Sequence, residues 1–255
     1  MFLVDDSGAP RPTVIFHGGY DSTVEELYVV LAAGALRRGY NVIAFDGPGQ
    51  GSVLRDQELY FRPDWEAVVT PVVDFALTMP EVSADRLVLV GMSLGGYLAA
   101  RAAAFEHRIA ACVLYDGVWD FHAPIVALAD TAASTPGGLE ALMAQSTGTR
   151  WTVNNGRWAF GVPGFDELVK AFEPYTMKGI ADRITCPTLV LDAENDQFLK
   201  GQPKQLFDAL TCQKELITFR EDEGGGEHCQ ESALFLFHQR TFDWLDTLLR
   251  LPAVC

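Results

Sequence analysis

A regular alternation of short apolar runs with longer helical patterns constrains the fold of this chain most strongly. The apolar runs are TVIFHGG (13–19), NVIAFDGPGQG (41–51), RLVLVGMSLGG (86–96), AACVLYDG (110–117), PTLVLDAEND (187–196) and ELITF (215–219). Helical patterns lie at 22–38, 64–78, 98–105 and 202–210, and a closing helix covers about 230–250. Strands that are apolar throughout and separated by helices form parallel sheets covered on both faces. We therefore expect an α/β fold with a mostly parallel, doubly wound sheet.

Residues 119–180 interrupt this alternation and are rich in aromatic side chains. We expect a mostly helical cap here, inserted into a core formed by residues 1–118 and 181–255. Four aromatic residues of this segment are candidates for substrate contact: Trp119, Phe121, Trp158 and Tyr175. The alternative is an ordinary aromatic subcore, because aromatic side chains most often pack against one another.

Length, charge and cysteine content restrict the class of protein. The 255 residues suffice for one large domain, and the net charge of −15 disfavours nucleic acid or an anionic membrane surface as partners. No apolar stretch approaches the roughly 20 residues that span a bilayer. The N-terminus lacks the pattern of a signal peptide, and five scattered cysteines form no CxxC pair. These features predict a cytoplasmic protein with reduced thiols.

The segment GMSLGG (91–96) carries the most specific chemical signal. A Gly-x-Ser-x-Gly sequence between a strand and a helix forms a nucleophile elbow, in which glycines permit a tight turn and the serine stands above the sheet. The helix that follows favours negative charge at its N-terminus. Ser93 is therefore the candidate nucleophile.

The segment HGG (17–19) ends the first strand and is the candidate oxyanion loop. Acyl transfer needs two backbone N–H groups directed at the oxyanion. We expect one from Leu94, which follows the nucleophile, and the other from Gly19 or Tyr20. His17 is expected to brace the loop rather than to act as a base.

An acid and a base should follow the serine in the order Ser, Asp or Glu, His. The acid belongs in a loop beyond its strand, which favours Asp196, with Asp192 and Glu194 as alternatives. His228, in GGGEHCQ (224–230), then lies after the last strand and is the candidate base.

Other chemistries fit the sequence poorly. The five histidines form no HExxH pair and Cys229 has no ligand spacing, so we expect no metal. The loop DGPGQGS (46–52) lacks the third glycine of a dinucleotide fingerprint and the lysine of a P-loop, so it is interpreted as a turn at the pocket rim, and no cofactor is expected. Cys229 is a weak candidate nucleophile because no second base lies nearby.

Several segments together resemble a known group of proteins. HGGYDSTVEELY, FDGPGQG, GMSLGGYLA, LYDGVWDF, LVLDAENDQFLKGQP and GGGEHCQESALFLFHQRTFDWLD are similar to α/β-hydrolases related to 2,6-dihydropseudooxynicotine hydrolase and the fermentation–respiration switch esterase, and most of all to fungal hydrolases that shorten heptaketide naphthopyrones. The resemblance covers nearly all of residues 12–250. It implies the α/β-hydrolase fold and a hydrolase that cleaves C–C bonds next to carbonyls, or esters, with Ser93 as nucleophile, Asp196 as acid and His228 as base.

The chain also departs from this group. Its members usually carry a helical N-terminal region that contributes to the substrate cavity and to dimer contacts, whereas this sequence begins close to the hydrolase core. We expect that region to be absent, either because the protein lacks it or because this chain is a shortened one. An uncovered sheet edge would favour a homodimer. The favoured function is hydrolysis of a β-diketone or polyketide-like small molecule. A carboxylesterase and a non-catalytic binding member of the fold are the alternatives.

Overall fold

A single parallel sheet forms the centre of the computed structural model, which describes residues 1–5 and 7–250. Its strands are β1 (Arg11–His17), β2 (Asn41–Phe45), β3 (Val82–Met92), β4 (Ala111–Tyr115), β5 (Thr188–Ala193) and β6 (Lys214–Phe219). They lie in the order β2-β1-β3-β4-β5-β6, and every neighbouring pair is parallel. The α/β-hydrolase fold expected from the sequence is confirmed. Cys255 lies outside the described residues.

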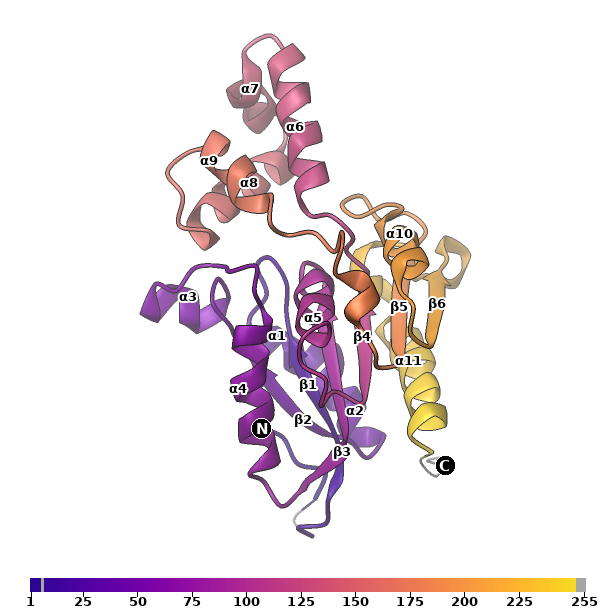
Figure 1. Ribbon diagram of the computed structural model, residues 1–255. Helices are drawn as coiled ribbons and strands as arrows, with labels where there is room; N and C mark the ends of the chain where they lie inside the picture. Colours follow the sequence, from indigo (N-terminus) through magenta and orange to yellow (C-terminus); the bar gives the residue numbers. More distant parts are fainter. Residues whose placement is uncertain (6, 251–255) are drawn as a thin grey trace.

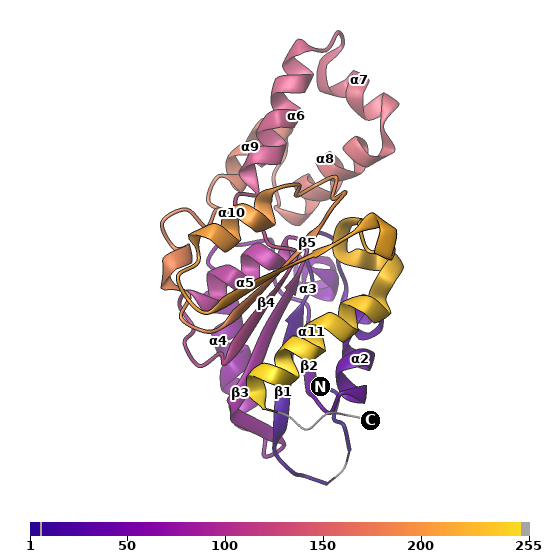
Figure 2. The same ribbon diagram turned by 90° about the vertical axis from the view of Figure 1, so that its right-hand side faces the viewer.

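Helices cover both faces of the sheet, as Figures 1 and 2 show. The helices of the first face are α4 (Glu66–Leu77), α5 (Gly95–Ala103) and α10 (Gln202–Ala209). The second face carries α1 (Val24–Leu27), the π-helical turn η1 (Tyr28–Ala32), α2 (Ala33–Arg37) and α11 (Leu234–Leu249). Side chains of a strand alternate between faces, so Leu87 and Leu89 join one core while Val88 and Val90 join the other. Burial on both faces explains why the strands are apolar throughout.

The remaining elements are short or lie in the expected insertion. Helix α3 (Gly51–Gln57) follows the glycine-rich loop after β2, and the short 3₁₀ turns are η2 (Ala181–Arg183), η3 (Glu221–Glu223) and η4 (His228–Ala233). The closing helix therefore begins at Leu234, after η4, and not at residue 230. None of the described helices combines the length and apolarity needed to cross a membrane.

Four helices follow β4 and stand over one end of the sheet (Figure 1). They are α6 (His122–Ser134), α7 (Gly138–Gln145), α8 (Thr147–Ala159) and α9 (Phe165–Phe172). Leu168 and Phe172 of α9 are buried, as are Val153 and Ala159 of α8. A short antiparallel bridge between Asp120 and Thr176 joins the two ends of this segment. The segment thus packs as a helical unit above the carboxyl ends of the strands, and we refer to α6–α9 as the cap helices.

Candidate active site

The carboxyl ends of the strands bring the predicted site residues together. Register pairs His17 at the end of β1 with Gly91 of β3, and Met92 at the end of β3 with Tyr115 at the end of β4. The loops that follow these strands therefore start side by side. Asp196 lies three residues beyond β5, and His228 begins the turn η4, which follows β6 and η3. In open parallel sheets this edge is where ligands bind.

Ser93 occupies the sharp turn between β3 and α5. Its φ is +61°, a left-handed conformation that a non-glycine residue adopts only when its surroundings hold it there. A hydrogen bond from the Ser93 backbone N–H to the carbonyl of Tyr115 holds the turn against β4. A side chain at Gly91 would collide with the backbone of Gly95, which accounts for the glycine two residues before the serine. This geometry matches the elbow predicted from the sequence.

A continuous hydrogen-bonded chain joins three of the predicted residues. His228 Nε2 lies 3.0 Å from Ser93 Oγ, and His228 Nδ1 lies 2.7 Å from Asp196 Oδ2. With its proton on Nδ1, His228 donates to Asp196 and keeps Nε2 free to accept from the Ser93 hydroxyl. Asp192 bonds to Thr218 and Glu194 to the backbone of Glu221, so neither alternative acid partners His228.

Burial and neighbouring groups shift the pKa values of Asp196 and His228. Burial alone would raise the pKa of Asp196, but the His228 hydrogen bond and charge and the N–H groups of Leu199 and Phe198 lower it overall. Burial alone would lower the pKa of His228, but the Asp196 hydrogen bond and the charges of Asp116, Asp196 and Glu231 raise it overall. A carboxylate that stays ionised beside a histidine is the arrangement that supports a general base.

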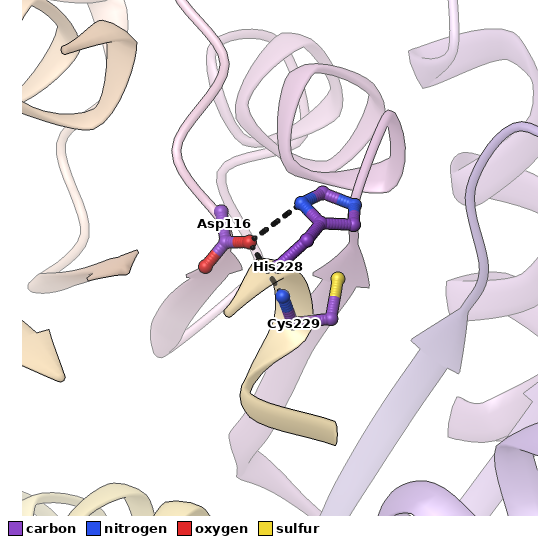
Figure 3. Close-up of side chains that lie close together, drawn as sticks. All are labelled: Asp116, His228 and Cys229. Atoms are coloured by element: carbon purple, nitrogen blue, oxygen red, sulfur yellow. Dashed lines mark hydrogen bonds and ion pairs between the residues drawn. The ribbon is translucent and has the colours of Figure 1, made fainter. Parts of the chain in front are cut away.

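Asp116 is a second carboxylate at His228, and the sequence reasoning missed it. It follows β4 directly, is fully buried, and places Oδ2 3.3 Å from His228 Nδ1 (Figure 3). The acids predicted from the sequence, Asp196, Asp192 and Glu194, all belong to β5 or to the loop after it. However, Asp116 also lies between Ser93 and His228 in the chain, at the carboxyl end of an apolar strand. That position was the available signal.

The predicted oxyanion loop lies against the elbow. The Gly19 N–H donates to Ser22 Oγ at 3.1 Å, whereas the N–H groups of Tyr20 and Leu94 have no acceptor among the described residues. Of the two alternatives at this loop, Tyr20 is the one whose N–H is not already donated within the described residues. His17 is fully buried behind the loop, its Nδ1 lies 3.2 Å from the Gly18 carbonyl, and burial lowers its pKa to about 4.

Gln50 braces this loop and was missed in the sequence. It is buried, and its Nε2 donates to the carbonyls of Gly18 at 2.7 Å and Gly19 at 3.2 Å. Its Oε1 accepts from the Gly47 N–H at 3.0 Å. The segment DGPGQGS, expected only as a turn at the pocket rim, therefore also supports the back of the candidate oxyanion loop.

A cavity of about 500 Å³ opens above Ser93 and His228. Its wall is largely aromatic and aliphatic, with Phe121, Ile125, Leu128, Trp151, Phe172, Phe198 and Leu199 among its large apolar members. Asp21 and Glu231 add two carboxylates, and none of the described residues that line it is a lysine or an arginine. Of the four aromatic residues predicted to contact substrate, only Phe121 belongs to this wall.

The other three candidates lie elsewhere, for distinct physical reasons. Tyr175 is 1% exposed and packs against Tyr97 and Phe160 in the core beneath the cap helices. Trp158 is 47% exposed and lies under the Arg55 guanidinium, outside the cavity. Trp119 lies in the connection to the cap helices, where its carbonyl accepts from the Met177 N–H. The expectation that these three residues line the pocket is corrected accordingly.

One cluster of potential metal ligands occurs in the described part of the chain, formed by Asp116, His228 and Cys229. Two of the three already have partners, since His228 Nδ1 bonds to Asp196 and Asp116 accepts from the Cys229 backbone N–H. Burial raises the pKa of the Cys229 thiol well above its usual range, which opposes the thiolate that metals and electrophiles require. The cluster is better explained as part of the hydrogen-bonded site.

Comparison with known proteins places the chain in a family. A family model described as "Alpha/beta hydrolase family" matches residues 13–243. The chain is 37% identical over 265 residues to 20-hydroxy-prefusarin hydrolase FUS2 of Gibberella moniliformis, covering 92% of this chain and 62% of that protein. It is 36% identical over 258 residues to hydrolase LUC6 of a Fusarium species, covering 92% of this chain and 61% of that protein. The chain thus spans about three fifths of the length of these relatives.

A solved structure shows the same architecture. The crystal structure of 2,6-dihydroxy-pseudo-oxynicotine hydrolase superposes with a TM-score of 0.77 at 25% sequence identity, covering 97% of this chain and 63% of that one. The match of the family model over most of the chain, the sheet order and these relatives lead to one conclusion. The chain belongs to the alpha/beta hydrolase family.

Proposed function

We propose that this protein is a serine hydrolase that cleaves a C–C bond next to a carbonyl in a small, β-diketone or polyketide-like molecule. The observation that carries the proposal is the chain from Ser93 Oγ through His228 to Asp196, at 3.0 and 2.7 Å, beneath an apolar cavity. The named hydrolases among the relatives support the reaction class. The resemblance noted in the sequence supports a bond next to a carbonyl.

The first half of the reaction forms an acyl-enzyme. His228 Nε2 takes the Ser93 hydroxyl proton while Oγ bonds to the substrate carbonyl carbon. The resulting oxyanion accepts from the Tyr20 and Leu94 N–H groups, which lack acceptors among the described residues. The C–C bond then breaks, and its electron pair leaves as an enolate stabilised by the second carbonyl. His228 returns the proton to that carbanion, which leaves as a neutral ketone.

The second half restores the free serine. Water attacks the acyl carbon while His228 accepts a water proton, and the same oxyanion donors hold the second tetrahedral intermediate. Collapse breaks the bond to Ser93 Oγ, which recovers its proton from His228. The acyl group leaves as a carboxylic acid. An ester follows the same path, except that His228 protonates a leaving alkoxide.

The cavity wall favours an uncharged, aromatic substrate. Its large side chains are apolar, and flat rings pack well against Phe121, Trp151 and Phe172. A carboxylated substrate would meet Asp21 and Glu231 without a compensating cation from the described wall. Burial, and to a lesser extent the charge of Glu231, raises the pKa of Asp21. The same negative charges would repel the carboxylate product and assist its release.

A substrate panel with matched variants tests the proposal. We expect the wild-type protein to hydrolyse uncharged aryl β-diketones, with the Ser93→Ala variant losing at least about 10³-fold in kcat. Ser52→Ala, which removes a hydroxyl exposed on α3, is the control and should match the wild type. Turnover of p-nitrophenyl esters alone would instead identify a carboxylesterase. Failure of Ser93 to react with a fluorophosphonate probe in the folded protein would indicate a non-catalytic binding member.

A further inference from the structure

Asp116 is a buried carboxylate beside His228, and the mechanism above gives it no role. It is fully buried at the carboxyl end of β4, and both of its oxygens accept hydrogen bonds. The Cys229 N–H donates to Oδ2 at 3.0 Å, and the Gln230 side-chain amide donates to Oδ1 at 3.0 Å. The same Oδ2 lies 3.3 Å from His228 Nδ1 (Figure 3). Burial raises the pKa of Asp116 above its ordinary value, whereas the His228 charge and the two N–H donors oppose that rise because they favour the ionised carboxylate.

The backbone of the histidine loop depends on these contacts. Cys229 and Gln230 adopt φ values of +54° and +45°, which cost free energy in non-glycine residues and need support from their surroundings. Asp116 supplies bonds to both residues, and the Tyr115 hydroxyl donates to the Cys229 carbonyl. The end of β4 therefore holds the turn that orients His228. The same strand end also accepts the Ser93 N–H, which ties the serine and the histidine to one anchor.

The charge of His228 is shared between acids from several elements. Asp196 contacts it from the loop after β5 and Asp116 from the end of β4, while the charge of Glu231 in η4 acts on it without an ion pair. Asp21, in the loop after β1, also faces it. Among the described residues, only Asp116 and Asp196 come within ion-pair distance of Nδ1, at 3.3 and 2.7 Å. A second carboxylate this close stabilises the imidazolium that forms whenever His228 holds the serine proton.

We propose that Asp116 is a second acid of this site, a positioning residue that shares the His228 imidazolium with Asp196 and fixes the turn on which His228 stands. This inference rests on the proposed function. When the Asp196 carboxylate is lost, Asp116 accepts the Nδ1–H bond and keeps His228 in the tautomer that Ser93 requires. Each of the two acids can therefore partly replace the other, whereas a site with one triad acid has no such replacement.

The chain offers a conservative variant for the test. In Asp116→Asn the introduced N–H₂ group would meet the N–H₂ of Gln230, but the Gln230 Oε1 is buried and has no partner among the described residues. A flip of the Gln230 amide turns Oε1 toward the introduced N–H₂, while the introduced amide carbonyl still accepts from the Cys229 N–H. The variant thus removes the charge and keeps the hydrogen bonds. Asp192→Asn is the matched control, because Asp192 bonds to Thr218 and does not reach His228.

A double-mutant cycle on kcat/KM tests the redundancy. Removing a triad aspartate elsewhere costs about 10⁴-fold. We expect Asp196→Asn to cost less, about 10²- to 10³-fold, and Asp116→Asn alone to cost about tenfold. The double variant should lose at least about tenfold more than the product of the single losses. Equal factors for Asp116→Asn in both backgrounds, or a complete loss from Asp116→Asn alone, would overturn the proposal.

A second measurement does not depend on activity. We expect NMR of the histidine ring in Asp196→Asn to retain a downfield, hydrogen-bonded Nδ1–H signal that disappears in the double variant. We also expect the His228 titration to move to lower pH in Asp116→Asn and to stay unchanged in Asp192→Asn. A purely structural Asp116 would leave that titration where it is, which would refute the shared charge. These NMR signals do not depend on turnover. If Ser93→Ala retained turnover, the proposed function would fail, and the NMR result would still decide whether Asp116 shares the His228 charge.

Discussion

The Tyr20 hydroxyl donates a 2.6 Å hydrogen bond to the backbone carbonyl of Thr152 in α8. The same residue accepts at its own carbonyl from the Asn155 side chain at 3.0 Å. Tyr20 also carries the N–H proposed to hold the oxyanion. The cap helices are thereby attached to the loop on which catalysis would depend, and Gly156 makes room for this contact because a side chain there would strike the Tyr20 hydroxyl.

The Tyr20→Phe variant isolates this attachment. The ring keeps its packing against Phe121 and Phe172, but the Thr152 carbonyl loses its donor. A hydrogen bond of this kind is worth about 1 kcal/mol, so we expect kcat/KM to fall about fivefold. Steady-state kinetics on the best aryl β-diketone measures the change. An unchanged kcat/KM would mean that the loop keeps its position without the cap helices.

Gln50→Ala probes the oxyanion loop from its other side. The Gly18 and Gly19 carbonyls lose their common donor, and the Gly47 N–H loses its acceptor. We expect kcat to fall about tenfold or more, because a loosened oxyanion donor stabilises the transition state less. Gln57→Ala, at the exposed end of α3, is the matched control. An effect confined to KM would argue against a role of this loop in stabilising the oxyanion.

The pH dependence of kcat/KM reports the charge around His228. The base must be neutral, and its surroundings raise its pKa, so activity should fall with decreasing pH along a limb centred above pH 6.5. In Glu231→Gln one contributing charge is lost and the limb should move to lower pH. The neighbouring exposed Glu227→Gln is the control. A limb that moves to higher pH in Glu231→Gln would contradict the charge arrangement described above.

Two tryptophans of α8 allow a cavity-lining residue to be compared with a surface residue of the same type. Trp151 lines the cavity, whereas Trp158 lies outside it beneath Arg55. We expect Trp151→Ala to raise KM for aryl substrates about tenfold, through lost ring packing worth about 1 to 2 kcal/mol. The same substitution at Trp158 should leave KM within twofold, a change of about 0.4 kcal/mol. Equal effects at both positions would contradict the assignment of this wall as the substrate site.

His17 should make the protein less stable in acid. Its folded pKa is about 4, because burial disfavours the charged ring, whereas an unfolded histidine takes a proton near pH 6.5. The free energy of unfolding therefore loses about 3 kcal/mol from this residue as pH falls from 6.5 to 4, and nothing above pH 6.5. His17→Phe keeps a ring against Phe45 and Trp65 and should flatten the pH dependence. Urea unfolding at several pH values checks this, and an unchanged slope would contradict it.

Much of the fold and the core of the candidate site could be predicted from the sequence, because local patterns carry them. Apolar runs predict buried strands, and glycines around Ser93 predict the elbow, since the left-handed conformation and the tight helix entry both need small neighbours. Ser93, Asp196 and His228 each follow a different strand, namely β3, β5 and β6. The strand order of a parallel sheet then aligns those ends, so the three residues come together without further information.

The sequence by itself thus determined the strands, the elbow and the identity of the three residues in the hydrogen-bonded chain. Only the tertiary structure decided which further side chains reach them. Asp116 meets His228 because the segment after β6 folds back over the end of β4, where Cys229 and Gln230 donate to Asp116, although the two residues are more than a hundred positions apart. Trp151 and Trp158 lie on one helix, about 10 Å apart along its axis, and only the first reaches the cavity. Local patterns encode which segments are buried, whereas long-range packing sets which buried side chains face one another.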